Sequence, residues 1–539
     1  MRDLVADCRD QDDALRAAGL DIWLGAEPTF TDRTSQEPHW LWAAEGGDKR
    51  ERADALLRAL ASRLGEGVRV EEVEGRRYPG EERPRFCVAA TYLPHGGGEA
   101  RVATVTPDPA VVEVNLPPAP DLAIFAAHVH AAYEAAAATG LSPERFRWNG
   151  HAGDSGGGGQ VTLGGPSPER SPFFLHPRLL PSLVRYLNHH PALSYAFAPE
   201  CVGSAGQGPR PDEGVRERFD ELGVALDRLA LRGAPGPEEL WGSLAPLLVD
   251  ASGNTHRAEL NVEKLWNPHL PGRGRMGVVE LRALRMPASP ERLVAIGALF
   301  RAVAARLARE PYEEPLLDWG PELHDRASLP HWMEQDLADV LADLEAHGVG
   351  PGRRLRAALA PDAPELARVE LSGARLVVRR APDFWPLVGD VASQEGSTAR
   401  VVDASSERLE LLVSSPGTHP GRLVAQGVEA PLETAGGPLH VAAVRYRAFA
   451  PRPGLHPGLA PHDPLVLEWE RHGEVLRVEL HGWKPGGGGY DGLPADAAEA
   501  ERRRRERVVV RPGRPRPALR FPGSRLTLDL RRLPAALPT

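Results

Sequence analysis

Three short runs in the chain alternate apolar residues with acidic, basic or amide residues, and this pattern restricts the fold most strongly. The runs cover residues 111–116, 256–261 and 278–283. Their polar members are Glu113 and Asn115, then Arg257, Glu259 and Asn261, and finally Glu280 and Arg282. Side chains alternate between the two faces of a strand, so each run predicts a strand with one apolar and one polar face.

Each run alone is also typical of an antiparallel sheet whose polar face is simply exposed to solvent. Three such runs in one chain, together with Glu27 in a Gly-Ala-Glu-Pro turn, favour a shared polar site. Carboxylates on a sheet can hold magnesium through oxygen ligands, and arginines can take up the remaining charge of a phosphate. The pattern therefore predicts the chemistry that a nucleotide-dependent ligase needs.

The rest of the chain mixes helical and strand patterns without strict β-α-β alternation, which is typical of the α+β class. Helical spacing of apolar residues predicts helices over 48–64, 121–140, 176–189, 212–231, 290–309 and 332–346. Further strands are expected over 21–30, 86–92, 101–105 and 110–116, and residues 256–262 and 277–284 are also expected to be strands.

The pattern changes after about Glu365 to short β-like runs separated by proline and glycine. We therefore predict a catalytic domain over residues 1–365 and a β-rich accessory domain over residues 366–495. Residues 496–539 are expected to form a charged helix, centred on 501–507, and a Pro/Arg-rich tail. A charge run of this kind is typical of a solvated surface.

Composition excludes several classes of function. The net charge of −10 gives no global reason to expect nucleic acid or a membrane surface as a partner, and no apolar run approaches the length of a membrane span. Three widely spaced cysteines support neither disulfides nor a zinc ribbon, which fits the cytoplasm. Only three of the 64 basic residues are lysines, and no G-K-[ST] motif occurs, so a P-loop is excluded. Arginines and metal ions must neutralise any bound phosphate.

Eight strings in the chain resemble a bacterial family of amidoligases, whose members usually follow a transglutaminase-like domain. The strings are G-A-E-P-T-F (25–30), D-K-R (48–50), Y-P-G-E (78–81), V-T-P-D-P-A-V-V-E-V-N (105–115), G-N-T-H-R-A-E (253–259), V-V-E-L-R-A (278–283), W-G-P-E-L-H-D-R (319–326) and V-R-Y-R-A-F (444–449). The resemblance implies a glutamine-synthetase-like fold, in which helices pack on a curved antiparallel sheet.

The same resemblance implies a role for individual residues. Metal ligands would be Glu27, Glu113 and Glu280, with Gln160 in a fourth position where relatives have histidine. ATP would contact Arg282, Arg257, His256 and Asn254, and the glycine-rich loop at Gly157 and Gly158 would lie over its phosphates. The implied cofactors are ATP and Mg²⁺, with Mn²⁺ as an alternative metal.

The sequence departs from the family pattern in three respects. No transglutaminase-like domain precedes the matching strings within these residues, and only a short glycine-rich connection joins Tyr92 to Arg101 where relatives carry a long insertion. Gln160 replaces the histidine of relatives, which affects one of the expected metal sites.

The resulting hypothesis is a carboxylate-amine ligase that forms an amide or isopeptide bond through an acyl phosphate. Arg257 and Arg282 would neutralise the transferred phosphoryl group, and Glu259 would take the proton of the amine. Its partners would be a carboxylate and an amine, among them a peptide or protein, and transglutaminase-like or other ligase proteins. The alternative is a non-catalytic binding or scaffold protein derived from the same fold.

Overall fold

The computed structural model describes residues 2–33, 49–64, 69–74, 86–92, 101–108, 111–270, 274–388, 402–417, 419–450, 455–520 and 525–532. The Y-P-G-E string and the glycine-rich connection after Tyr92 lie outside these residues. None of the helices in the described segments has the length and apolar character needed to cross a membrane.

A four-stranded antiparallel sheet forms the centre of the larger lobe. Its order is β1-β10-β13-β12, and the strands are β1 (Trp23–Glu27), β10 (Gln160–Gly164), β13 (Val279–Leu281) and β12 (Leu260–Asn261). Glu27 pairs with Gln160, and Glu280 pairs with both Thr162 and Asn261. This register brings polar residues that are far apart in the sequence onto one face.

A second antiparallel sheet has the order β3-β4-β5-β6-β2-β7. Its strands are β3 (Arg69–Glu74), β4 (Phe86–Tyr92), β5 (Arg101–Asp108), β6 (Val111–Asn115), β2 (Thr29–Asp32) and β7 (Leu141–Ser142). Strand β6 also follows the start of the chain, because Leu116 N donates to Ala26 O and Val114 N donates to Pro28 O, both at 2.9 Å. The two sheets therefore meet at β1 and β6.

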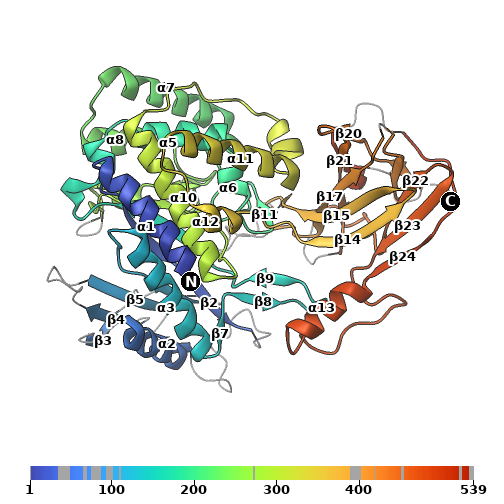
Figure 1. Ribbon diagram of the computed structural model, residues 1–539, viewed down its shortest axis with the longest axis horizontal. Helices are drawn as coiled ribbons and strands as arrows, with labels where there is room; N and C mark the ends of the chain where they lie inside the picture. The colour runs from blue at the N-terminus through green and yellow to red at the C-terminus, as the bar shows by residue number, and fades with distance from the viewer. Residues whose placement is uncertain are drawn as a thin grey trace.

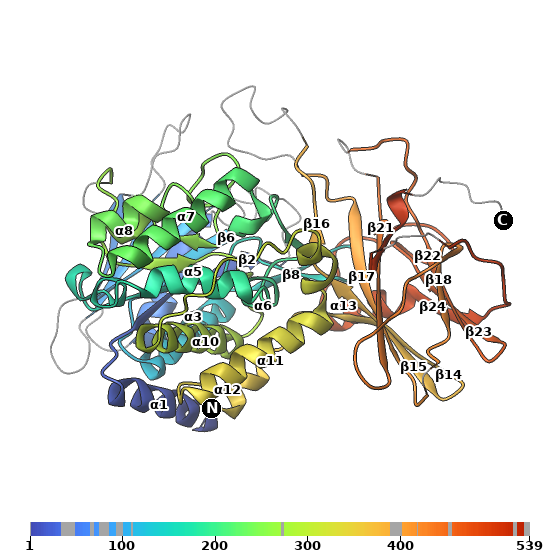
Figure 2. The same ribbon diagram turned by 90° about the horizontal axis from the view of Figure 1, so that it is seen from above.

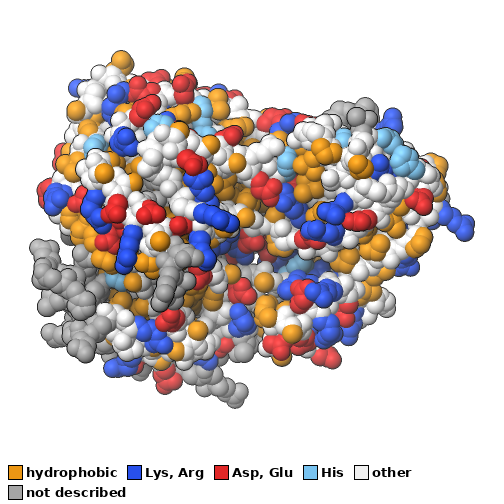
Figure 3. Space-filling model, viewed as in Figure 1, with side chains coloured by type: hydrophobic (Ala, Val, Ile, Leu, Met, Phe, Trp, Pro, Cys, Tyr) orange, Lys and Arg blue, Asp and Glu red, His pale blue; other side chains and the backbone are white. Residues whose placement is uncertain are grey.

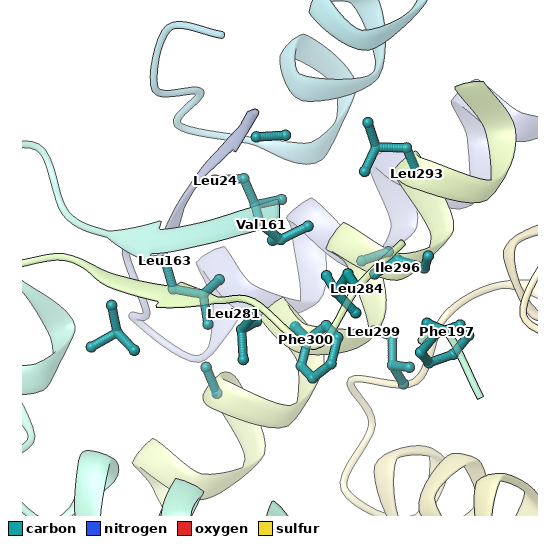
Figure 4. Close-up of a cluster of buried hydrophobic side chains, with 14 of the residues drawn as sticks. Leu24, Val161, Leu163, Phe197, Leu281, Leu284, Leu293, Ile296, Leu299 and Phe300 are labelled. Carbon is teal, nitrogen blue, oxygen red and sulfur yellow. The ribbon is translucent and has the colours of Figure 1, made fainter. Parts of the chain in front are cut away.

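Helices cover the apolar faces of these sheets and pack on one another (Figures 1 and 2). They are α1 (Arg2–Ala17), α2 (Lys49–Leu64), α3 (Leu122–Ala138), α5 (Leu179–His189), α6 (Ala192–Tyr195), α7 (Arg216–Arg232), α8 (Pro237–Leu244), α10 (Pro290–Arg309), α11 (Pro330–Ala346) and α12 (Arg353–Ala357). Helix α10 is almost wholly buried and packs behind the four-stranded sheet. Figure 4 shows this layer, in which Leu24, Val161, Leu163 and Leu281 of the sheet meet Leu293, Ile296, Leu299 and Phe300 of α10.

The smaller lobe is rich in β-structure and has a separate apolar core. One sheet contains β14 (Glu365–Leu371), β15 (Ala374–Ala381), β17 (Ser406–Ser414), β21 (Leu439–Arg447) and β20 (Glu433–Thr434). The other contains β19 (Val428–Glu429), β18 (Arg422–Ala425), β22 (Leu465–Arg471), β23 (Glu474–Leu480) and β24 (Val508–Pro512). Strands β24 and β25 (Thr527–Asp529) pair with β23 and β21, so parts of the expected tail belong to these sheets.

The structure confirms the α+β class, but it corrects two predictions about local structure. Of the strand expected over 256–262, only Leu260 and Asn261 are extended. The Asp250 carboxylate accepts hydrogen bonds from the backbone of Ser252 and Asn254, and the Asn254 side chain accepts one from His256 N. These local turns compete with sheet pairing, so the preceding residues form turns.

The second correction concerns the charged helix α13 (Ala497–Glu506), which is not simply a solvated surface. It packs on the hairpin of β8 (Glu144–Phe146) and β9 (Ala152–Asp154). Arg503 donates to Trp148 O at 2.7 Å, and Arg504 donates to Gly150 O. The arginines therefore satisfy backbone carbonyls of the larger lobe, which a charge pattern alone does not reveal.

The contact between α13 and the hairpin requires glycine at position 150. Gly150 has φ +83°, and a Cβ there would lie 2.2 Å from Ala500 O. Gly373 has φ +77° but open space around it, so it is a matched control. Alanine in the left-handed region costs about 1–2 kcal/mol at either site. We expect Gly150→Ala to lower the melting temperature clearly more than Gly373→Ala, and equal losses would contradict a tight α13 contact.

Candidate active site

Carboxylates from three strands gather where the two sheets meet, on the side of the strands away from the apolar core. Glu27 ends β1, Glu280 lies in the middle of β13, and Glu113 lies in the middle of β6. The intervening residues Val112 and Leu281 are buried in the core, as alternation predicts. The predicted facing of the runs 111–116 and 278–283 is therefore confirmed.

Gln160 lies between two of these carboxylates. In the amide orientation that satisfies its neighbours, its nitrogen donates to Glu27 Oε2 at 2.5 Å and to Glu280 Oε1 at 2.8 Å. Its oxygen accepts from Arg282 Nη2 at 3.0 Å and from Gln207 Nε2 at 3.2 Å. Gln160 thus links the acids to the bases of the cluster.

Two cations partly balance the acids. Arg282 Nη1 lies 2.8 Å from Glu280 Oε1, and Lys264 Nζ lies 3.6 Å from Glu27 Oε1. Asn115 Nδ2 donates to Glu113 Oε1 at 3.0 Å. We call Glu27, Glu113, Asn115, Gln160, Gln207, Lys264, Glu280 and Arg282 the polar cluster.

The polar cluster carries more negative than positive charge. Burial, followed by the charges of Glu280 and Glu113, raises the pKa of Glu27 to about 8. Burial also opposes ionisation of Glu280, but Arg282 and Lys264 outweigh it and keep the pKa of Glu280 below its ordinary value. Burial acts to lower the pKa of Lys264, yet Glu27 and Glu280 raise it overall. Glu27 is therefore the carboxylate that lacks a full counter-charge.

The predicted arginines lie close together. Burial and the charge of Arg282 lower the pKa of Arg257, so the two guanidinium groups are electrostatic neighbours. Arg282 Nε is buried and has no hydrogen-bond partner among the described residues. The pair can therefore supply positive charge and free donors to an anion beside the carboxylates.

The glycine-rich loop connects β9 to β10 and ends at Gln160. A Cβ at Gly157 would lie 2.7 Å from Thr29 Oγ1, so glycine is needed there for packing. Gly158 forms an isolated bridge with Arg285, and its carbonyl accepts from Thr29 Oγ1 at 3.4 Å. Packing accounts for these glycines, and their contact with phosphates stays a prediction.

The side chains of three predicted residues contact groups outside the polar cluster. Asn254 is exposed and caps a turn, and His256 Nε2 lies 2.9 Å from Glu263 Oε2. The Glu259 carboxylate is buried, accepts a hydrogen bond from Ser194, and lies 3.5 Å from Arg210 Nη1. Burial raises the pKa of Glu259 to about 7, although Arg210 opposes the shift.

Sequence reasoning missed Lys264 and Gln207 as members of the cluster. The signal for Lys264 was present, because a chain that uses arginine almost throughout has lysine at this position. Gln207 gave no such signal, since it lies in a loop and reaches Gln160 only in the folded chain.

The fold and the cluster define an α+β protein with a buried carboxylate and arginine site. The family model described as "Putative amidoligase enzyme (DUF2126)" matches residues 2–97 and 90–531, and the chain belongs to this family. Membership supports a carboxylate-amine ligase in general. No curated protein matches the chain.

Distant likenesses to solved structures were also found. The structure titled "GmaS/ADP complex-Conformation 1" has a TM-score of 0.28 and 15% identity, and the match covers 66% of this chain and 72% of that chain. The structure titled "Apo GmaS without ligand" has a TM-score of 0.26 and 16% identity, covering 66% of this chain and 71% of that chain.

The different surroundings of Glu27 and Glu280 predict that Glu27→Gln and Glu280→Gln shift the melting temperature in opposite directions when EDTA is present. Because the pKa of Glu27 is about 8, the folded protein holds one proton more than the unfolded chain between about pH 4.5 and 8, and stability falls as the pH rises through this range. Glu27→Gln removes this loss, so we expect its melting temperature to exceed that of the wild type by roughly 3 °C or more at pH 8.5 and by less at pH 5.

Glu280→Gln is the matched comparison. The pKa of Glu280 is lowered, so its charge contributes stability above its ordinary pKa, and the substitution leaves Arg282 without its carboxylate. We expect a lower melting temperature at pH 8.5. Shifts of the same sign for the two variants in calorimetric scans would contradict the assignment of Glu27 as the uncompensated acid.

Proposed function

We propose that this chain is an ATP- and Mg²⁺-dependent ligase that joins a carboxylate to an amine. The observation that carries the proposal is the gathering of Glu27, Glu280 and Glu113 beside Arg282 and Arg257, in which burial and the neighbouring carboxylates raise the pKa of Glu27 to about 8. A nucleotide with a divalent ion brings both the cation that the carboxylates lack and the anion that the arginines can bind.

The polar cluster fits a hard cation, although no group of three or more histidine, cysteine, aspartate or glutamate side chains in the described part of the chain already converges on one point. Glu27 and Glu280 lie on either side of the Gln160 amide, and Glu113 contributes to the same negative field. These carboxylates would hold Mg²⁺, which keeps several waters in its shell. The Gln160 oxygen would join them once the amide turns so that its oxygen, in place of its nitrogen, faces Glu27 and Glu280. When bound, the ion would neutralise charge on the phosphates.

The proposed reaction has two steps. An oxygen of the substrate carboxylate attacks the γ-phosphorus of ATP, the bond to the β-phosphate oxygen breaks, and ADP leaves. The amine then attacks the acyl carbon, loses a proton, and expels phosphate to leave an amide. Arg282 and Arg257 bind the oxygens of the transferred group, where fixed positive charge stabilises the transition state.

Glu259 fits a positioning role better than the predicted role as proton acceptor. Its carboxylate is engaged by Ser194 and Arg210, and its carbonyl accepts from Arg282 N at 2.9 Å. Arg210 is fully buried and also donates to Leu187 O at 2.9 Å. Glu259 therefore fixes the backbone at Arg282, the residue that directly follows β13.

The first test is calorimetric titration of ATP with Mg²⁺ and with excess EDTA. We expect binding only with the metal, since ATP alone would add negative charge to the carboxylates. Equal affinity in both conditions would contradict the proposal. Arg282→Ala should weaken Mg·ATP binding by about tenfold or more. Arg375→Ala, which removes an exposed arginine paired with Glu370, is the control and should bind normally.

A second test uses Gln160→His. Imidazole suits transition metals better than magnesium, so if the Gln160 oxygen is a metal ligand, the variant should bind Mn²⁺ more tightly and retain nucleotide binding. The measurement is metal titration by calorimetry at fixed ATP. An unchanged Mn²⁺ affinity with a changed ATP affinity would instead assign Gln160 to direct contact with the nucleotide.

A further inference from the structure

A buried amide group beside the polar cluster lacks a hydrogen-bond partner. Asn261 ends β12 and is 3% exposed, and its Nδ2 has no partner among the described residues. Buried polar groups in folded proteins are hydrogen-bonded with few exceptions, because an unpaired donor lowers the free energy of unfolding. An unpaired donor at this place therefore indicates an acceptor that comes from a ligand.

The amide of Asn261 cannot satisfy its nitrogen by turning over. Its Oδ1 accepts from Glu263 N at 2.7 Å, and Glu263 is the first residue of α9 (Glu263–Trp266). A backbone N–H only donates, so the amide atom that faces it must be the oxygen and the other must be the nitrogen. The free group is therefore a donor in a fixed position.

The strand register places Asn261 on the same face as the carboxylates. Asn261 pairs with Glu280, whereas the neighbouring pair, Leu260 and Leu281, lies in the apolar core. Directly opposed residues of an antiparallel pair point to the same side of the sheet, with Cβ atoms roughly 4.5–5.5 Å apart. Asn261 therefore lies beside Glu280, the carboxylate that Arg282 Nη1 contacts at 2.8 Å.

Another asparagine on the polar faces uses its amide within the chain. Asn115 Nδ2 donates to Glu113 Oε1 at 3.0 Å. The Glu280 carboxylate instead accepts from Arg282 Nη1 and from the amide of Gln160. Asn261 Nδ2 and Arg282 Nε are left over: both are buried near Glu280, and neither has an acceptor in the described part of the chain.

Charge at the surface is a weaker indication of a ligand than these buried donors. Basic and acidic side chains are interspersed over the face of the molecule drawn in Figure 3. Exposed charges can pair with one another or with water at little cost, so they do not mark a site by themselves. A buried donor has no such alternative, which is why Asn261 is more informative.

Two free donors next to three carboxylates restrict the class of ligand. A divalent ion alone would satisfy the carboxylates and leave the donors unpaired. An anion alone would satisfy the donors and add to the negative charge. A phosphoryl group that carries a divalent ion satisfies both, because the ion binds the carboxylates and the terminal phosphate oxygens accept from the donors.

We propose that Asn261 is a binding residue for the phosphoryl group that the ligase transfers, with its Nδ2 donating to an oxygen of the γ-phosphate that Arg282 also contacts. This assignment rests on the proposed function, because it takes Mg·ATP as the ligand. It adds a neutral donor to the two arginines. It also makes Asn261 a residue that distinguishes ATP from ADP, since ADP has no γ-phosphate.

The test is calorimetric titration of Mg·ATP and Mg·ADP into Asn261→Ser, without carboxylate or amine substrates. Serine keeps a side-chain oxygen that can accept from the backbone two residues further on, but it lacks the amide donor. Asn267→Ser is the matched control. Asn267 Oδ1 accepts from His269 N at 2.9 Å in the same kind of turn, and Asn267 lies outside the polar cluster.

We expect Asn261→Ser to bind Mg·ATP at least about tenfold more weakly than the wild type, because it loses a hydrogen bond to a charged group. Its affinity for Mg·ADP should be unchanged. Asn267→Ser should match the wild type for both nucleotides. An unchanged affinity of Asn261→Ser for Mg·ATP, or an equal loss for both nucleotides, would overturn the proposal.

Asn261→Asp provides a second variant in case serine disturbs the fold. Aspartate keeps the shape of the side chain and the acceptor for Glu263 N, but it replaces the free donor by an acceptor. We expect the preference for Mg·ATP over Mg·ADP to fall by about tenfold or more. An unchanged preference in this variant would overturn the proposal.

The wild-type titration separates this proposal from the proposed function. If the wild type binds Mg·ATP and Asn261→Ser binds it equally well, the role of Asn261 is contradicted and the ligase stands. If the wild type does not bind Mg·ATP, the proposed function is contradicted, and the role of Asn261 is contradicted with it.

Discussion

Mutual repulsion among Glu27, Glu280 and Glu113 is the constraint on which the rest of the larger lobe depends. Like charges gathered in a partly buried place oppose one another, and Lys264 and Arg282 balance them only in part. What holds them is the opposite face of the same strands. Each buried aliphatic side chain there contributes about 1.5–3 kcal/mol to the free energy of unfolding. A polar face is tolerated because its apolar counterpart is so well packed.

The smaller lobe contacts the segment of the larger lobe that leads to the polar cluster. Helix α13 holds the tip of the β8–β9 hairpin through arginine contacts with backbone carbonyls, and the hairpin continues into the loop that ends at Gln160. Glu200 fixes the base of the same region by pairing with arginines of both lobes. These contacts place the smaller lobe next to the segment of chain that leads to the polar cluster.

The sequence was sufficient to place Glu113 and Glu280 on polar faces, because alternation in a strand is a local property of the backbone. It was not sufficient for Glu259. Capping of the preceding turns by Asp250 and Asn254 depends on side-chain hydrogen bonds that compete with strand pairing. Nor could it reveal the bonding of Arg503 on α13, because an arginine that binds a distant carbonyl looks the same in sequence as one in solvent. The sequence therefore predicts which residues share one face of a strand. It does not predict which distant segments pair with each other, because those contacts form only in the folded chain.

The polar cluster also bears on the choice between an enzyme and a scaffold. A protein that used this surface only for packing would gain from glutamine at position 27, since an amide keeps the shape of the side chain and removes the uncompensated charge. The register partner of Glu27 in the neighbouring strand is Gln160. An amide side chain is therefore already accommodated on this face of the sheet, directly beside position 27. Groups that reduce stability are typical of functional sites. A carboxylate that folding does not need, next to arginines with a free donor, favours the proposed site for a cation and a phosphate over a surface used only for packing.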